Sequence, residues 1–306
     1  MTWTDIATWV FDGPCRNLWP LLVLPALAGR ISDRCARFFP VTGVAPFQAA
    51  ALTALPGAVT LGLASVALAQ GLTRGLPDTP RDMILGVVTP AVAASIILYA
   101  SCRALLRHLA MKRLCELSEV PGPRLAAASA VVGVRAREIR IRDPECFIVG
   151  LVRPTAYVSR GALDRLSDAE LRAVLHHERA HARSHDPATL SVLSFLADLA
   201  PTTGRAFEAY RRAREQCADQ AAVRQVGPLV LASALLAMVR SHAGLPAVSM
   251  SSMIGAWRLE LMLGLTTPAP LSRQAHRRIR MGLFANVLLA AWPLPQIALL
   301  YIFCSS

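Results

Sequence analysis

Two histidines and a glutamate form the most specific chemical pattern in this chain. His177 and His181 stand at positions i and i+4, and Glu178 directly follows the first histidine. On a helix, both imidazoles share one face and can reach a single metal ion, while Glu178 leans over the same site. Zinc suits this arrangement, because imidazole nitrogen is a favoured ligand and a catalytic zinc keeps one position for water. The pattern therefore predicts a catalytic zinc site.

A third protein ligand is expected on a later helix. Glu215 lies in a strongly helical stretch downstream, and Asp219 shares its helical face. Asp219 can accept a hydrogen bond from the far nitrogen of a ligand histidine, which fixes the orientation of the ring. The alternative is that Glu215 is exposed and pairs with Arg211 or Arg214. Beside a helix that carries the two histidines, we favour Glu215 as the third ligand.

The elements that must position these residues also have sequence signals. Ser167 and Glu170 form a capping box that starts the histidine helix, and Asp186-Pro187 marks its end. The other expected elements of this region are strands at Glu138 to Ile141 and Phe147 to Ser159 (with a turn near Gly150 and Pro154), a helix from about Arg205 to Gln225, and a short buried helix at Leu229 to Val239. This region is therefore predicted to be a mixed α+β domain.

The composition indicates a membrane protein. Apolar residues make up 54% of the chain and charged residues only 17%, whereas soluble domains are about a quarter charged. The net charge of +12 comes from basic residues beside apolar runs, which is typical of membrane proteins and does not favour direct nucleic-acid binding. The seven cysteines include no C-x-x-C pair and are interpreted as free thiols.

Four hydrophobic stretches predict transmembrane helices, and they divide the chain. The predicted spans are about 14–29, 44–72, 83–106 and 281–306, the first being short and the second interrupted by Pro56 and Gly57. The predicted domains are residues 1–106 with three spans, 107–280 as a protease domain and 281–306 as the last span. The fold class is thus an α+β membrane protein with a zinc protease domain inserted between the third and fourth spans.

Basic residues at the ends of the spans predict the orientation, because they stay on the cytoplasmic side. Arginines precede the second and fourth spans, and Arg103, Arg107, Lys112 and Arg113 follow the third. We therefore expect a multi-pass protein of the cytoplasmic membrane, in contact with the lipid bilayer. Both termini are expected outside, and the 107–280 region faces the cytoplasm.

The motif and its surroundings resemble a known family. The run Leu175 to Pro187, the later Glu215-x-x-Ala218-Asp219 and the approach Ser159 to Leu171 are similar to the gluzincin proteases, specifically the BlaR/MecR-type membrane zinc metallopeptidases. The resemblance implies a cytoplasm-facing endopeptidase whose Zn²⁺ is held by two histidines and a glutamate. The best-known members continue into an extracellular penicillin-binding sensor, whereas this chain stops at Ser306, so antibiotic sensing is not implied for it.

The resemblance also implies roles for individual residues. Glu178 is the general base that takes a proton from the zinc-bound water and passes it to the leaving amine. A substrate strand is expected along a sheet edge, for which Val152 to Ser159 is the candidate. His242 is a candidate stabiliser of the transition state, as is Arg258, and each has a purely structural alternative. The remaining residues weighed are Asp186, as a site residue or a simple turn residue, and His176 and His185, taken as surface or packing residues.

Three functions remain open from the sequence. The first is a signal-transducing protease that cleaves itself or a cytoplasmic regulatory protein, for which a transcriptional repressor is the family-typical substrate. The second is a membrane scaffold or signalling subunit that retains the fold without using it. The third is a housekeeping membrane protease of the related gluzincins. The intact set of His177, Glu178, His181 and Glu215 favours an active protease over a scaffold.

Overall fold

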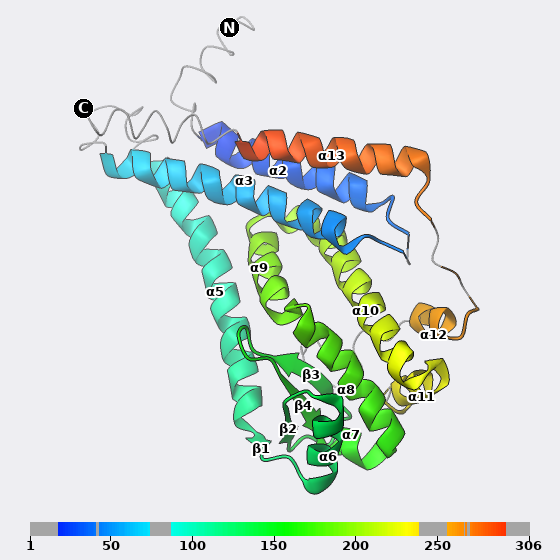
Figure 1. Cartoon of the computed structure of the whole chain (residues 1–306). Coiled ribbons are helices and arrows are strands. Elements are labelled where there is room, and N and C mark those ends of the chain that lie inside the picture. The colour runs from blue at the N-terminus through cyan, green and yellow to red at the C-terminus, as the bar shows by residue number, and fades with distance from the viewer. Residues whose placement is uncertain are drawn as a thin grey trace, which may run out of the picture.

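The computed structural model describes residues 18–40, 43–73, 87–238, 256–265, 267 and 270–291. The described chain is mostly helical and contains one small sheet. Figure 1 shows three helices lying together at one end of the molecule, the sheet at the other end, and long helices running between them. The three helices are α2 (Leu18–Ala36), α3 (Pro46–Thr73) and α13 (Arg273–Ala291), and the connecting helices are α5 (Thr89–Glu116), α9 (Asp186–Leu199) and α10 (Gly204–Val226).

Two of these helices are long and apolar enough to cross a membrane. They are α3 over Pro46–Ala69, with a mean hydropathy of 1.8, and α5 over Thr89–Glu116, with a mean hydropathy of 1.5. Within the described residues α2 and α13 do not qualify, because each joins an apolar half to a half that carries three or more charged residues. The predicted spans at 14–29, 83–106 and 281–306 extend outside the described residues. The division at 106 and 280 stays a prediction, and α5 continues past 106 to Glu116.

Helix α3 runs without a break through Pro56 and Gly57, so the predicted interruption is wrong. Proline lacks the N–H that an interior helix position normally donates, but membrane helices tolerate it where neighbours supply other partners. The Thr60 hydroxyl donates a hydrogen bond to the Pro56 carbonyl at 3.0 Å. Gly57 lets α9 approach closely, since a Cβ there would lie 2.3 Å from the Leu196 carbonyl oxygen.

This close contact gives a first prediction. Gly57→Ala should destabilise the protein by about 1–3 kcal/mol, because the new methyl group meets backbone that cannot move cheaply. The matched control is Gly204→Ala at the start of α10, where a Cβ meets nothing within 4 Å. The thermal unfolding midpoint of the full chain in detergent should fall for Gly57→Ala and stay unchanged for Gly204→Ala. Equal midpoints would show that α3 and α9 do not pack this tightly.

The sheet has the strand order β1-β2-β4-β3. Its strands are β1 (Ser118–Glu119), β2 (Ala136–Ile139), β3 (Cys146–Val149) and β4 (Thr155–Ser159). Strand β4 pairs with β2 in parallel and with β3 in antiparallel register, so the prediction that Val152 to Ser159 forms the edge is wrong. The predicted turn is confirmed at Gly150, with φ of 120°, and it folds β3 back along the outer side of β4. Strand β3 therefore forms one edge of the sheet, and β1 forms the other.

Helices cover the sheet and build the core that supports the site. They are α6 (Pro123–Val132), α7 (Arg160–Arg165), α8 (Asp168–Arg183) and α11 (Pro228–Met238), followed by the short α12 (Ala256–Met262). Leu171 and Leu175 of α8 pack with Leu231 and Leu235 of α11, which confirms the predicted buried helix. A second core joins α9 and α10, linked by the 3₁₀ turn η2 (Pro201–Thr203), to α2, α3 and α13. Helix α8 is thus fixed between the sheet and α10.

Candidate metal centre

The helix that carries the two histidines begins as its sequence predicts. Ser167 caps α8, its hydroxyl accepting from the Glu170 amide at 3.4 Å, while the Glu170 carboxylate accepts from the Ser167 amide at 2.8 Å. This reciprocal pair satisfies two backbone donors at the helix start and fixes the rotation of α8. The face that α8 buries includes His177, Glu178 and His181, with exposed fractions of 1%, 3% and 8%.

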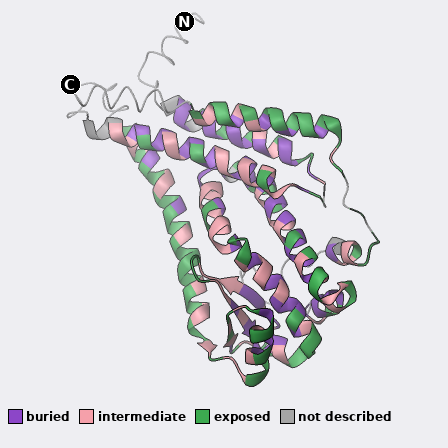
Figure 2. Cartoon of the chain, in the orientation of Figure 1, coloured by how far each residue is buried: buried purple, intermediate pink, exposed green. Residues whose placement is uncertain are grey.

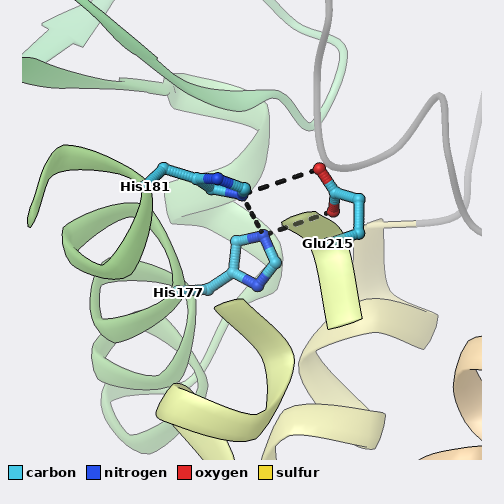
Figure 3. A group of neighbouring side chains, drawn as sticks. All are labelled: His177, His181 and Glu215. Atoms are coloured by element: carbon cyan, nitrogen blue, oxygen red, sulfur yellow. Dashed lines mark hydrogen bonds and ion pairs between the residues drawn. The ribbon is translucent and has the colours of Figure 1, made fainter. Parts of the chain in front are cut away.

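Two helices bring His177, His181 and Glu215 together. One ligand atom from each residue lies within 4.8 Å of the others. Figure 3 shows both imidazoles of α8 pointing toward the carboxylate of Glu215 on α10. The Nε2 atoms of His177 and His181 are 3.0 Å apart, and they lie 3.4 and 3.6 Å from the two Glu215 oxygens.

Each histidine also has a carboxylate behind it. Asp219 Oδ1 lies 2.9 Å from Nδ1 of His177, and Asp186 Oδ2 lies 2.7 Å from Nδ1 of His181. A carboxylate at Nδ1 favours the tautomer with its proton there, which leaves the Nε2 lone pair free.

Two Nε2 lone pairs and a carboxylate therefore converge in a buried space. Glu215 Oε2 is buried and forms no hydrogen bond among the described residues, although it lies within ion-pair distance of the Arg258 guanidinium. With each imidazole protonated only at Nδ1, all three groups are acceptors, and they repel one another unless a proton or a metal cation lies between them. Two imidazoles and a carboxylate with a fourth position open is also the donor set of catalytic zinc sites. The residues present therefore fit a divalent metal ion such as zinc.

The electrostatics of the site reflect the same convergence. Burial lowers the pKa of His177, but the carboxylates of Asp219 and Glu215 outweigh it and raise this pKa to about 10. Burial raises the pKa of Glu215, yet His177 and Arg258 hold it well below its usual range. For Glu178, burial dominates and its pKa is raised above the ordinary value for glutamate. The buried carboxylates thus favour a positive charge, either a proton or a metal ion, at the histidine nitrogens.

A fully buried arginine balances the two carboxylates of α10. Arg258 of α12 has no exposed surface, and its Nε donates to Asp219 Oδ2 at 2.8 Å. Its Nη1 lies 3.1 Å from Glu215 Oε2. Since both carboxylates occupy its guanidinium, Arg258 holds Glu215 and Asp219 in place.

The structure also places the other residues weighed in the sequence. Asp186 begins α9 and bridges His181 to Arg214, whose Nε donates to it at 2.8 Å. Arg214 therefore pairs with Asp186, and Arg211 pairs with Glu208, so neither arginine is the partner of Glu215. His176 is partly exposed, and His185 is exposed with a φ of 54°. His242 lies outside the described residues.

Comparisons with known proteins agree with this geometry. A family model described as BlaR1 peptidase M56 matches residues 18–251, which is more than half of the chain. A relative named Protease HtpX homolog 2, from Methanosarcina mazei, is 35% identical over 95 residues, covering 30% of this chain and 29% of the relative. Protease HtpX homolog of Moorella thermoacetica is 32% identical over 95 residues, covering 30% and 28%. The matched segment thus spans less than a third of these relatives.

No solved structure matches the chain. The family match includes every described residue of the metal centre except Arg258, because it extends from α2 through the histidines of α8 and Glu215 to residue 251. The chain therefore belongs to the BlaR1 peptidase M56 family.

Proposed function

We propose that this chain is a membrane-anchored zinc endopeptidase with four spans. Three spans precede the protease region and one follows it, which puts both termini outside and the protease region in the cytoplasm. The basic ends of α5 and α13 support this orientation, because arginine and lysine stay on the cytoplasmic side. The long apolar α5, mostly exposed along its length, supports its burial in lipid.

The observation that carries the proposal is the convergence of acceptors at the metal centre. His177 and His181 offer Nε2, and Glu215 offers a carboxylate oxygen. When bound there, zinc supplies Lewis-acid polarisation of the scissile carbonyl and lowers the pKa of its water. Asp219 and Asp186 keep each imidazole in the tautomer that presents Nε2.

Glu178 performs the proton transfers. Its carboxylate is buried beside His177 and His181, where it accepts a proton from the attacking water and delivers it to the nitrogen of the leaving amine. Strand β3 packs near α8 and has a free edge in the described sheet. It offers main-chain groups that can align an extended substrate segment by strand addition.

Removing the metal tests the proposal. The full chain in detergent, incubated with an unfolded protein such as casein, should lose cleavage on treatment with a chelator and regain it when zinc is added. Magnesium, which prefers oxygen ligands, should not restore activity. Cleavage that survives complete zinc removal would contradict a metallopeptidase mechanism at this site.

The two aspartates behind the histidines give a further prediction. Asp186→Asn should weaken zinc binding by about 10-fold to 100-fold, because the amide can no longer hold the His181 ring as a carboxylate does. Asp198→Asn on the same helix is the matched control, since Asp198 pairs with Arg107 of α5 and lies far along α9 from the site. Zinc affinity measured by chelator competition should change for the first variant only. A similar loss of zinc affinity in both variants would mean that Asp186→Asn weakens zinc binding only by destabilising α9.

For the substrate, we propose the chain itself or a cytoplasmic regulatory protein, such as a transcriptional repressor, in a signalling pathway. A second candidate is a housekeeping membrane protease; the names of the relatives, which are proteases, agree with either candidate. A proteomic comparison of cells carrying wild type or Glu178→Gln separates the two. One or a few accumulating regulators support signalling, whereas a broad set of accumulating membrane proteins supports housekeeping.

A further inference from the structure

Helix α13 packs against α3 and, in the antiparallel direction, against α2, and these two contacts define its inner face. The Asn286 amide donates to the Ser32 hydroxyl at 2.9 Å. A Cβ on Gly282 would meet the Cys35 sulfur, so the two helices touch there. Near its start, the guanidinium of Arg278 lies 4.9 Å from the centre of the Phe38 ring. The residues on the opposite side of α13 therefore face outward.

The outer face of α13 is a single stripe that changes from cationic to apolar. Arg273, Arg277 and Arg280 lie at i, i+4 and i+7, and all three are exposed. The same stripe continues with Phe284 and Leu288, whose side chains are 65% and 56% exposed. Figure 2 shows this outer face exposed along α13. The change occurs within one helical turn, between Arg280 and Phe284.

The cationic half of the stripe has no counter-charge among the described residues. None of its three arginines lies within ion-pair distance of a carboxylate there, and α13 contains no acidic residue. The arginines also sit at the start of the helix, where the backbone dipole is positive and repels cations. Since these charges repel one another and the helix end, an external anion would stabilise the segment.

The apolar half selects the kind of anion. A soluble anion or a nucleic acid would contact the arginines alone and make no use of Phe284 and Leu288 on the same stripe. A phospholipid meets both halves, with its phosphate at the arginines and its acyl chains along the apolar residues. We propose that the outer face of α13 binds anionic phospholipids through Arg273, Arg277 and Arg280. The proposal requires α13 to lie in the membrane but does not depend on peptidase activity.

The test uses the full chain in nanodiscs that contain equal parts of phosphatidylcholine and phosphatidylglycerol. Native mass spectrometry then counts the lipids that stay bound. The wild type should retain phosphatidylglycerol in preference to phosphatidylcholine. Each basic residue near a membrane surface contributes about fivefold to anionic lipid affinity, so a triple change of Arg273, Arg277 and Arg280 to Gln should weaken retention by roughly tenfold to a hundredfold.

Two further variants separate charge from folding. The triple change to Lys keeps the charge and should restore phosphatidylglycerol retention. The control replaces Arg165, Arg172 and Arg224 with Gln, because these exposed arginines at the protease end also lack an ion partner among the described residues, and it should retain lipid like wild type. Equal retention in the wild type and the α13 Gln variant would overturn the proposal. So would a single-stranded DNA or polyglutamate probe that binds at these arginines in place of the lipid.

Discussion

Glu178→Gln should lose nearly all proteolytic activity while it keeps its zinc. The change removes one proton-accepting oxygen from the buried side chain next to His177 and His181, but it keeps the shape. General acid–base catalysis is worth about 10²-fold to 10⁴-fold, so we expect a loss in turnover of roughly a thousandfold. The three atoms that offer ligands to the metal come from other residues, so zinc stoichiometry should stay unchanged.

The control for this variant is Glu208→Gln. Glu208 lies on the surface of α10 and pairs with Arg211, away from the site. Its activity and zinc content should equal those of the wild type. Two measurements are needed, turnover of an unfolded protein substrate and zinc content by mass spectrometry. Wild-type turnover in Glu178→Gln would show that Glu178 is not the general base. An inactive wild type would instead favour the scaffold alternative.

Arg258→Met should destabilise the zinc-free protein more than any surface change. The variant leaves Glu215 and Asp219 buried beside each other without their shared cation. Removing one partner of a buried ion pair costs about 3–5 kcal/mol, because the remaining charge cannot regain its hydration. The midpoint of thermal unfolding in detergent should therefore fall by roughly 10 °C.

Zinc should reduce this loss, since a bound cation compensates Glu215 in place of the guanidinium. The matched control is Arg211→Met, which breaks a surface pair with Glu208 and should cost less than about 1 kcal/mol. A small shift for Arg258→Met, equal to that of the control, would show that the arginine does not neutralise the two carboxylates. A large fall in the unfolding midpoint that zinc does not reduce would show that Arg258 stabilises the protein independently of the metal centre.

The parts of the site that were predictable are those that local sequence determines. The capping box of Ser167 and Glu170 and the i, i+4 spacing of the histidines lie within one helix, so its periodicity alone places both imidazoles on one face. Helix α10 was predicted from its composition, and Glu215 and Asp219 share a face on it for the same reason. Only the relative position of the two helices required the fold.

The contacts that were not predictable join residues from different helices or strands. Arg258 reaches Asp219 from a separate short helix, and no local pattern in its own segment indicates which carboxylates it meets. Asp186 was left open, because its role depends on α9 starting at the turn after His181. The position of β4 within the sheet depends on the side to which β3 folds, and alternation of apolar residues carries no information about that choice.

The metal ligands themselves can be tested by X-ray absorption at the zinc edge of the full chain in detergent. For the wild type, we expect one zinc ion per chain, with two imidazole nitrogens and oxygen ligands and no sulfur, as His177, His181 and Glu215 require. Glu215→Ala should lower the zinc affinity and change the oxygen part of the spectrum while both histidine signals remain. Zinc that binds through sulfur, or a spectrum and affinity unchanged by Glu215→Ala, would contradict this metal centre.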